Sequence, residues 1–183
     1  MLLDTPVCDF GWQAPDFTLR DADGAAHTLS DHLGEKGALV AFLCNHCPYV
    51  QAIAERLAKD ADTLMAEGIG VLAVMSNDYR YVHADSPPNM KRYAAKVGWR
   101  FPYLVDEDQA VGKSWGAVCT PEFFGLNAAG GLQYRGRLDD ARMGDATGRT
   151  PELVDAMRQI AATGQGPRHQ TPSMGCSIKW RAG

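Results

Sequence analysis

The chain has 183 residues, of which 45% are apolar, and a net charge of −4 at pH 7. This acidic balance argues against a nucleic-acid partner, because nucleic-acid binding usually requires a basic face. The apolar content is enough for one sizeable core, so we expect residues 1–183 to form a single domain.

The N-terminal segment resembles neither a secretory signal nor a membrane span. Its first residues, MLLDTPVCDFGW, contain no Lys or Arg and meet Asp4 and Pro6 early. The longest apolar stretch of the chain, residues 38–44, is far too short to cross a bilayer. We therefore expect no membrane association and a cytoplasmic location. No pattern in the sequence indicates an oligomeric state.

The first half of the chain alternates between strand and helix patterns. Residues 14–20 alternate and lead into Asp-Ala-Asp-Gly, which predicts a strand and hairpin near the N-terminus. Residues 38–43 form a continuous apolar run, typical of a strand covered on both faces. Apolar residues then recur at helical spacing over 50–68, and residues 69–75 indicate a second buried strand.

The second half continues this alternation. Its expected elements are, in order, a helix opened by Ser86-Pro87-Pro88, a short strand at 101–105, a short helix between Asp106 and Gly116, a hairpin of 123–126 with 132–135, and a helix over 150–164. Residues 165–183 show little pattern and are expected to be an irregular tail. The order of elements predicts an α/β fold.

Two cysteines, Cys44 and Cys47, lie where the first buried strand meets the first long helix. Backbone N–H groups and the helix dipole at such a junction stabilise a thiolate and lower a thiol pKa. The C-x-x-C spacing can close a disulfide, and in a β–α–β context it is typical of a thioredoxin-like redox pair. His46, between the two, would favour a thiolate on Cys44 and make the disulfide more oxidising.

Other uses of the pair are less favoured. A zinc site needs four ligands, whereas the remaining cysteines and the histidines outside the pair are scattered singly, so we expect no metal site. The five cysteines are an odd number in a chain that is not small, which argues against a disulfide scaffold.

A second feature lies at Thr120 and Pro121, just before a predicted strand. In a thioredoxin-type fold, a cis-proline after Thr would face the cysteine pair and receive an extended substrate backbone. The adjacent Cys119 is a candidate accessory thiol, with a small buried apolar side chain as the alternative. Cys176, on the Gly-containing tail, is a second candidate accessory thiol that could resolve a disulfide or recruit a partner, with a structural role as the alternative.

Several segments together resemble a known family. They are APDFTL, FLCNHCPYV, DSPPNMKRYA, FPYLVDEDQAVGKSWGAVCTPEFF, YRGRLDDAR and GCSIKW. They are similar to the thioredoxin-like superfamily, and within it to peroxiredoxin-like redoxin proteins of the AhpC/TSA type. The resemblance implies a thioredoxin-like fold, a central mixed β-sheet flanked by helices, with an N-terminal β-hairpin extension. The peroxiredoxin pattern P-x-x-x-T/S-x-x-C would place Cys47 at the peroxidatic position, but Val40 and Cys44 replace its Pro and Thr.

We therefore expect a thiol–disulfide oxidoreductase whose Cys44 and Cys47 exchange disulfides with a protein partner or a small thiol reductant. By analogy with thioredoxin-type enzymes, Cys44 would attack from the helix start, and Cys47, one turn in and more buried, would resolve. Thr120, Pro121 and His46 would contact the substrate, and no cofactor beyond the redox-active disulfide is implied.

Two alternatives stay open. In a thiol-dependent peroxidase, Cys47 would attack the peroxide and Cys44 would resolve the sulfenic acid. In a non-enzymatic metal-binding chaperone, Cys44, Cys47 and His46 would supply the ligands.

Overall fold

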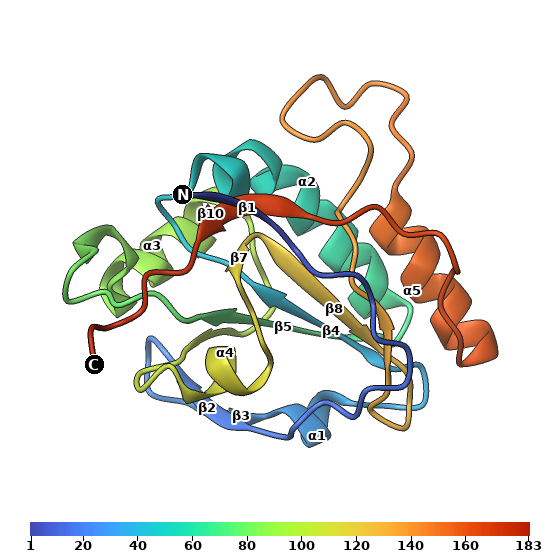
Figure 1. The fold of residues 1–183 in the computed structure, drawn as a ribbon, viewed down its shortest axis with the longest axis horizontal. Helices are drawn as coiled ribbons and strands as arrows, with labels where there is room; N and C mark the ends of the chain where they lie inside the picture. The colour runs from blue at the N-terminus through green and yellow to red at the C-terminus, as the bar shows by residue number, and fades with distance from the viewer.

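The computed structural model describes residues 1–183 and is built around a seven-stranded mixed sheet of order β3-β2-β6-β5-β4-β8-β9 (Figure 1). Strands β4, β5 and β6 run parallel, and the remaining pairs are antiparallel. The bounds are β2 Thr18–Asp21, β3 Ala26–Thr28, β4 Ala38–Phe42, β5 Gly70–Met75, β6 Tyr103–Val105, β8 Glu122–Leu126 and β9 Leu132–Tyr134. The expected mixed sheet and the N-terminal hairpin, β2 with β3, are confirmed.

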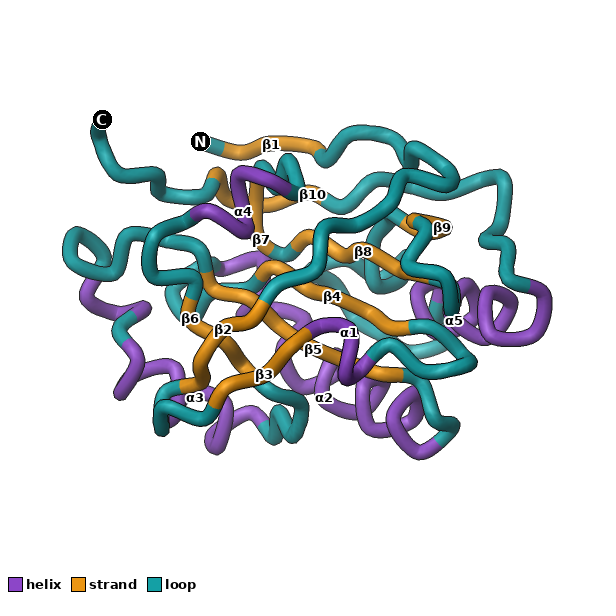
Figure 2. Tube along the Cα trace, turned by 90° about the horizontal axis from the view of Figure 1, so that it is seen from below, coloured by secondary structure: helices purple, strands orange, loops and turns teal.

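Helices cover both faces of this sheet. Helices α2 (Pro48–Ala66), α3 (Pro87–Val97) and α5 (Glu152–Thr163) lie on one face, and the short α1 (Leu29–His32) and α4 (Ala110–Ser114) lie on the other (Figures 1 and 2). Successive side chains of a strand point to opposite faces. Accordingly, the odd-numbered residues of the central strand β4 join the core under α2, and Val40 and Phe42 join the core under α4. This two-sided burial explains the continuous apolar run. None of the helices combines the length and apolar character needed to cross a membrane.

Helix α2 carries the long apolar stripe that the sequence predicts. Its buried residues recur at the three- and four-residue spacing that places them on one helical face. The chain leaves the helix at Gly68, whose φ of +85° lies in the left-handed region that favours glycine. At the other end the helix begins at Pro48, where a proline costs no hydrogen bond because the first N–H groups have no partner within the helix.

A separate three-stranded sheet, of order β1-β10-β7, joins the two ends of the chain to its middle. It consists of β1 (Leu2–Asp4), β10 (Met174–Ser177) and β7 (Cys119–Thr120). The segment 165–183, for which the sequence indicates an irregular tail, thus contains a strand. Figure 1 shows β10 between β1 and β7, near the N-terminal end of α2.

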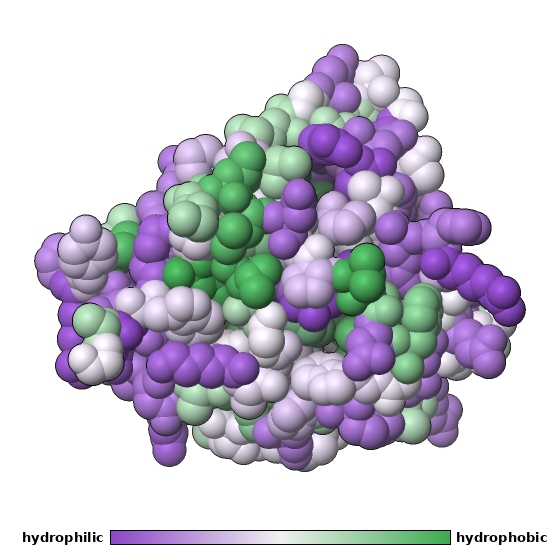
Figure 3. Space-filling view, in the orientation of Figure 1, coloured by the Kyte–Doolittle hydropathy of each residue, from purple (hydrophilic) through white to green (hydrophobic).

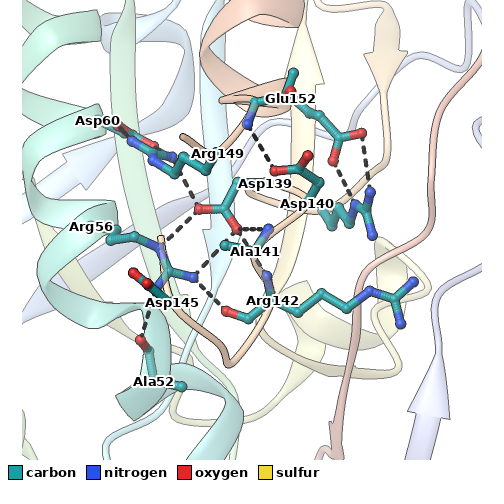
Figure 4. A network of polar contacts seen from close by, with 12 residues as sticks. Ala52, Arg56, Asp60, Asp139, Asp140, Ala141, Arg142, Asp145, Arg149 and Glu152 are labelled. Atoms are coloured by element: carbon teal, nitrogen blue, oxygen red, sulfur yellow. Dashed lines mark hydrogen bonds and ion pairs between the residues drawn. The ribbon is translucent and has the colours of Figure 1, made fainter. Parts of the chain in front are cut away.

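An ionic network fastens the long connection between β9 and α5 to helix α2 (Figure 4). The buried Asp139 carboxylate accepts hydrogen bonds from Arg56 Nε at 2.9 Å and from Arg149 Nη1 at 3.1 Å. Arg149 also pairs with Asp60 of α2, with Nη2 to Oδ1 at 2.6 Å. Since α2 contributes both Arg56 and Asp60, this network fixes the loop beside the helix that bears the cysteine pair.

Candidate active site

The cysteine pair lies at the junction of β4 and α2, but the helix begins later than the sequence analysis expected. Cys47 is the residue that caps α2, with extended backbone at φ −72° and ψ 123°, and Pro48 is the first helical residue. A proline pushes the residue before it out of the helical region, which makes Cys47 the cap. The expectation that Cys44 sits at the helix start with Cys47 one turn in is therefore wrong. The free N–H groups of the first turn lie nearest to Cys47.

Both cysteines are buried. Cys44 is 1% exposed and Cys47 is 0% exposed, so the expected contrast between an accessible first thiol and a buried second one is absent. All five cysteines are free thiols in this structure. A substrate of any size can therefore reach the two sulfurs only if the groups that cover them move aside.

Thr120 and Pro121 lie beside the pair, as expected for a thioredoxin-like fold. The hydroxyl Oγ1 of Thr120 is 3.2 Å from Cys44 Sγ, and the Thr120 carbonyl O is 3.3 Å from Cys47 Sγ. The peptide bond between Thr120 and Pro121 is cis. Residues more than 70 positions apart in the chain are thus brought into one site.

The two thiols differ in acidity. A hydrogen bond from the Cys44 thiol lowers the pKa of Cys47 to about 4, against the opposing effect of burial. Hydrogen bonds from Cys176 and from the Val50 N–H act in the same direction. The same shared hydrogen bond, together with burial, raises the pKa of Cys44 well above its usual value. At neutral pH the thiolate is therefore on Cys47, whereas the sequence analysis favoured Cys44.

This acidity gives a testable prediction. We expect the ultraviolet absorbance of thiolate in the reduced protein to persist down to about pH 5, because one thiol has a pKa near 4 rather than the ordinary 9.0. The measurement is a pH titration of reduced wild type, with Cys47→Ser as the variant that removes the signal and Cys8→Ser as the matched control that keeps it. A wild-type titration with its only midpoint between about 8 and 9 would contradict the assignment.

Asp85 fixes the loop between the two cysteines. It lies in a short 3-10 turn, η1 (His83–Asp85), and is 0% exposed. Its Oδ1 accepts from the backbone N–H of Asn45 at 2.7 Å and of His46 at 3.3 Å. Its Oδ2 accepts from Asn77 Nδ2 at 2.9 Å and pairs with His46 Nδ1 at 2.6 Å. The sequence predicts no function for Asp85, because a single acidic residue in a loop carries no recognisable pattern.

The charged forms of His46 and Asp85 stabilise each other. The hydrogen bond to Asp85 raises the pKa of His46 above its usual value in spite of burial. Burial would raise the pKa of Asp85, but the hydrogen bonds from His46, Asn77 and Asn45 hold it below its usual value. The imidazole of His46 hydrogen-bonds the carboxylate and neither sulfur, so it positions the loop instead of activating Cys44 directly.

Asn45 adds further restraints on the same loop. Its Oδ1 accepts a hydrogen bond from the Tyr103 hydroxyl at 2.9 Å, and its Nδ2 donates to the Ala84 carbonyl at 2.9 Å. Its backbone carbonyl accepts from Gln51 Nε2 at 2.9 Å. The loop therefore holds the cysteines in place before any substrate binds, which lowers the entropic cost of reaction.

The site contains one group of side chains whose atoms could bind a metal ion. Potential donor atoms of Cys44, His46 and Asp85 lie within 4.8 Å of one another. Each oxygen of Asp85 already accepts two hydrogen bonds, so metal binding would have to displace some of them. This set differs from the one expected for the chaperone alternative, which included Cys47 in place of Asp85.

The two candidate accessory thiols have different environments. Cys176 of β10 is partly exposed, pairs with Thr120 in the small sheet, and packs against the core that contains the cysteine pair. Burial and the hydrogen bond to Cys47 raise the pKa of Cys176 to about 11. Cys119 is fully buried, and this burial raises its pKa strongly. Cys119 forms no hydrogen bond to either member of the pair, so its surroundings fit a packing residue.

A groove of about 530 Å³ runs beside Pro121, between the start of α2 and the loop that the ionic network fastens. Figure 3 shows apolar side chains gathered on this face of the molecule, over β1 and β10. The groove is lined by Asp4, Tyr49, Ile53, Pro121, Phe123, Arg137, Leu138, Asp139, Arg142, Met143, Thr171, Pro172, Ser173 and Met174.

A mixed sheet flanked by helices, with a cis-proline beside a thiol pair at the start of the first long helix, defines the class of thioredoxin-like proteins. The model of the AhpC/TSA family matches residues 10–136, and the chain belongs to this family.

Similar proteins carry two kinds of name. The thiol-disulfide oxidoreductase ResA of Geobacillus thermodenitrificans is 26% identical over 120 residues, which is 66% of this chain and 64% of ResA. Peroxiredoxin Bcp of Escherichia coli is 29% identical over 112 residues, which is 61% of this chain and 67% of Bcp. These names support the expected oxidoreductase activity, but they do not distinguish a thiol–disulfide oxidoreductase from a peroxiredoxin.

Solved structures match over the whole chain. An uncharacterized conserved protein from Geobacillus kaustophilus superposes with a TM-score of 0.92 at 37% identity, covering 100% of this chain and 98% of its own. A hypothetical protein from Sinorhizobium meliloti superposes with a TM-score of 0.91 at 37% identity, covering 98% of this chain and 99% of its own. Neither name states an activity.

Proposed function

We propose that the protein is a thiol–disulfide oxidoreductase whose Cys44 and Cys47 alternate between a dithiol and a disulfide. The observation that carries the proposal is the position of both sulfurs at the start of α2 against Thr120, with Cys44 Sγ 3.2 Å from its hydroxyl and Cys47 Sγ 3.3 Å from its carbonyl oxygen. It places a thiolate, on Cys47, next to the thiol that can resolve its mixed disulfide. The reaction needs no group besides the two sulfurs.

The exchange follows from these positions. The Cys47 thiolate attacks one sulfur of a partner disulfide, forms a mixed disulfide, and releases the partner's first thiolate. Cys44 then gives its proton to the partner's released thiolate and attacks Cys47 Sγ, so that the Cys44–Cys47 disulfide forms. The partner's second sulfur leaves as a thiolate, and with a proton from water the partner becomes a dithiol. The pair gives up two electrons and the partner gains them. The Thr120 hydroxyl, with Oγ1 3.2 Å from Cys44 Sγ, is placed to donate a hydrogen bond to the Cys44 sulfur, which favours the ionised form of Cys44 that attacks.

Stabilising the Cys47 thiolate has a consequence for the direction of electron flow. A lowered thiol pKa stabilises the reduced form and makes the disulfide more oxidising. The partner is a protein thiol or disulfide, or a small thiol, and the groove beside Pro121 is the surface where we place its docking. A cytoplasmic location stays a prediction.

A thiol-dependent peroxidase is the second candidate, because the most acidic thiol is Cys47 and Cys47 occupies the position that resembles the peroxidatic one. In that reaction the Cys47 thiolate attacks a peroxide oxygen and becomes a sulfenic acid, which Cys44 converts to the same disulfide with loss of water. The absence of the pattern's Thr at residue 44 removes a hydroxyl that would polarise the peroxide.

One experiment compares the candidates on the same enzyme. Reduced protein is mixed with oxidised glutathione, with a protein disulfide such as insulin, or with hydrogen peroxide, and Cys44–Cys47 disulfide formation is followed by alkylation and peptide mapping. We expect faster oxidation by a disulfide than by peroxide at equal concentration, with Cys8→Ser behaving as wild type. Peroxide oxidation faster by about tenfold or more, with turnover under a thiol reductant, would overturn the proposal in favour of the peroxidase. Stoichiometric bound metal without disulfide formation would overturn it in favour of the chaperone.

A further inference from the structure

Strand β10 lies directly against the wall of the active site. Its Cys176 is paired with Thr120, the residue whose hydroxyl and carbonyl contact the two catalytic sulfurs. The neighbouring Gly175 comes so close that a Cβ there would lie 1.8 Å from the Thr120 carbonyl oxygen. Only glycine permits this approach.

Contacts just before β10 and along its far side hold the strand in this place. The Ser173 hydroxyl donates to the Pro121 carbonyl at 2.7 Å, and the Ser173 N–H donates to the Thr5 hydroxyl at 3.2 Å. On its far side β10 pairs with β1, with Leu2 opposite Cys176. The chain's own terminal strand thus occupies the edge of Thr120 that an extended substrate segment would otherwise meet.

This placement determines which thiol a reagent reaches first. Cys44 and Cys47 are 1% and 0% exposed, whereas Cys176 is partly exposed, packs against the core that contains the pair, and lies opposite Thr120, whose carbonyl oxygen is 3.3 Å from Cys47 Sγ. Disulfide exchange requires direct contact of three sulfurs, so a buried pair reacts with an external thiol only through an opening or through an intermediate thiol.

We propose that Cys176 is a third redox residue, which carries disulfide exchange between the buried Cys44–Cys47 pair and an external dithiol. This inference rests on the proposed function and adds a route to it. In the first step the Cys176 sulfur attacks Cys47 Sγ of the oxidised pair. The Cys44–Cys47 bond breaks, the Cys47–Cys176 bond forms, and the Cys176 proton passes to the departing Cys44 sulfur. The number of disulfides is unchanged, so this step needs no oxidant.

The second step uses an external dithiol as the reductant. One of its thiols attacks Cys176 Sγ and releases Cys47 as a thiolate. Its other thiol then attacks the sulfur bound to Cys176, and the dithiol leaves as a disulfide. The protein gains two electrons, one proton stays on Cys176, and the other goes to water because Cys47 remains ionised. Run in reverse, the same steps oxidise a dithiol inside the protein and reduce an external disulfide.

The chemistry of the three sulfurs agrees with this order. In the reduced protein burial raises the pKa of Cys176 most, and the hydrogen bond to Cys47 and the negative charge of Cys47 raise it further. The two contributions from Cys47 disappear when Cys47 is in a disulfide and the contribution of burial remains, so the pKa of Cys176 falls and more of it is thiolate in the state in which it must attack. The position of Cys176 opposite Thr120, beside Cys47, directs the attack to Cys47 Sγ. Because the pKa of Cys44 is high, its sulfur is a slow leaving group as a thiolate and takes up the Cys176 proton as it departs.

The first test traps the intermediate. In Cys44→Ser, mild oxidation with one equivalent of diamide is expected to give an intramolecular Cys47–Cys176 disulfide as the main product, identified by alkylation and peptide mass mapping. Adding Cys176→Ser to this variant removes the product, and adding Cys119→Ser, the matched control on the neighbouring strand, does not. A Cys47–Cys119 bond, or Cys47 oxidised with Cys176 free, would overturn the relay.

The second test measures the relay in the chain that keeps its pair. We expect Cys176→Ser to slow reduction of the Cys44–Cys47 disulfide by reduced thioredoxin, used as a protein dithiol probe, by about tenfold or more. Cys8→Ser should react at the wild-type rate, and thermal melting of Cys176→Ser should match wild type. An unchanged or faster rate would overturn the relay and leave the proposed function standing. If the Cys44–Cys47 disulfide never forms in wild type, the proposed function itself fails.

Discussion

Replacing Cys47 with serine is expected to abolish disulfide exchange, with a loss of roughly a thousandfold or more, as when other enzymes lose their nucleophile. The reason is that Cys47 is the thiol with the pKa near 4, it caps α2, and its sulfur bonds in turn with every partner in the proposed reaction. The measurement is the rate of insulin disulfide reduction with dithiothreitol as the electron source, compared for wild type and Cys47→Ser.

The matched variant Cys44→Ser tests the order of the two thiols. Because Cys44 only resolves, this variant should keep the first attack, and with Cys176→Ser added, so that no other thiol resolves, the reaction should stop as a mixed disulfide between Cys47 and the partner. Mass spectrometry of this double variant after reaction with oxidised glutathione should show one glutathione on Cys47. If Cys47→Ser instead forms a stable adduct on Cys44, the attacking residue is Cys44, as the sequence analysis first expected. In Cys44→Ala, which removes the donor altogether, loss of the hydrogen bond to Cys47 should also raise the pKa of Cys47 and slow the attack near pH 6 by a measurable factor.

Local patterns in the sequence were sufficient for the large sheet and its helices. The run at residues 38–43 predicted β4 because a strand buried on both faces has no polar positions, and the apolar spacing after Val50 predicted α2 because one helical face packs on that strand. The position of Thr120 and Pro121 before a strand also predicted the wall of the site, because the thioredoxin-like fold fixes which strand end meets the start of α2.

Three features of the structure were not predicted, for different reasons. The helix start was recoverable: Pro48 favours the first helical position, which makes Cys47 the cap, but the C-x-x-C analogy with thioredoxin placed the start earlier. Strand β10 was not recoverable, because its four residues, MGCS, have no alternation and pair with Leu2 and Thr120, both distant in the chain. Asp85 was not recoverable either, because its partners become neighbours only after the sheet forms.

Asp85→Ala is expected to lower the free energy of unfolding by about 3–5 kcal/mol, the cost of removing one partner of a buried ion pair and leaving the others unsatisfied. The substitution leaves two backbone N–H groups, an Asn77 amide and the His46 ring without their acceptor. Urea unfolding of the reduced protein measures the change. Asp23→Ala is the matched control, because Asp23 pairs with Lys91 at the surface and its loss should change stability by at most about 0.5 kcal/mol. Equal effects of the two substitutions would contradict the proposed restraint of the loop.

The pH dependence of the stability difference between wild type and Asp85→Asn shows whether the His46–Asp85 ion pair or packing alone stabilises the loop. The lowered pKa of Asp85 contributes stability above its ordinary value of 3.8, and this contribution is lost as pH falls through the folded-state pKa. The raised pKa of His46 contributes stability fully below its ordinary value of 6.5, and this contribution is lost as pH rises through the folded-state pKa. Wild type should therefore exceed Asp85→Asn in stability most strongly between pH 3.8 and 6.5, with a smaller difference on either side. Asn keeps the size of the Asp side chain and removes its charge. A stability difference between wild type and Asp85→Asn that stays constant with pH would therefore show that the shape of the side chain, and not the His46–Asp85 charge pair, holds the catalytic loop.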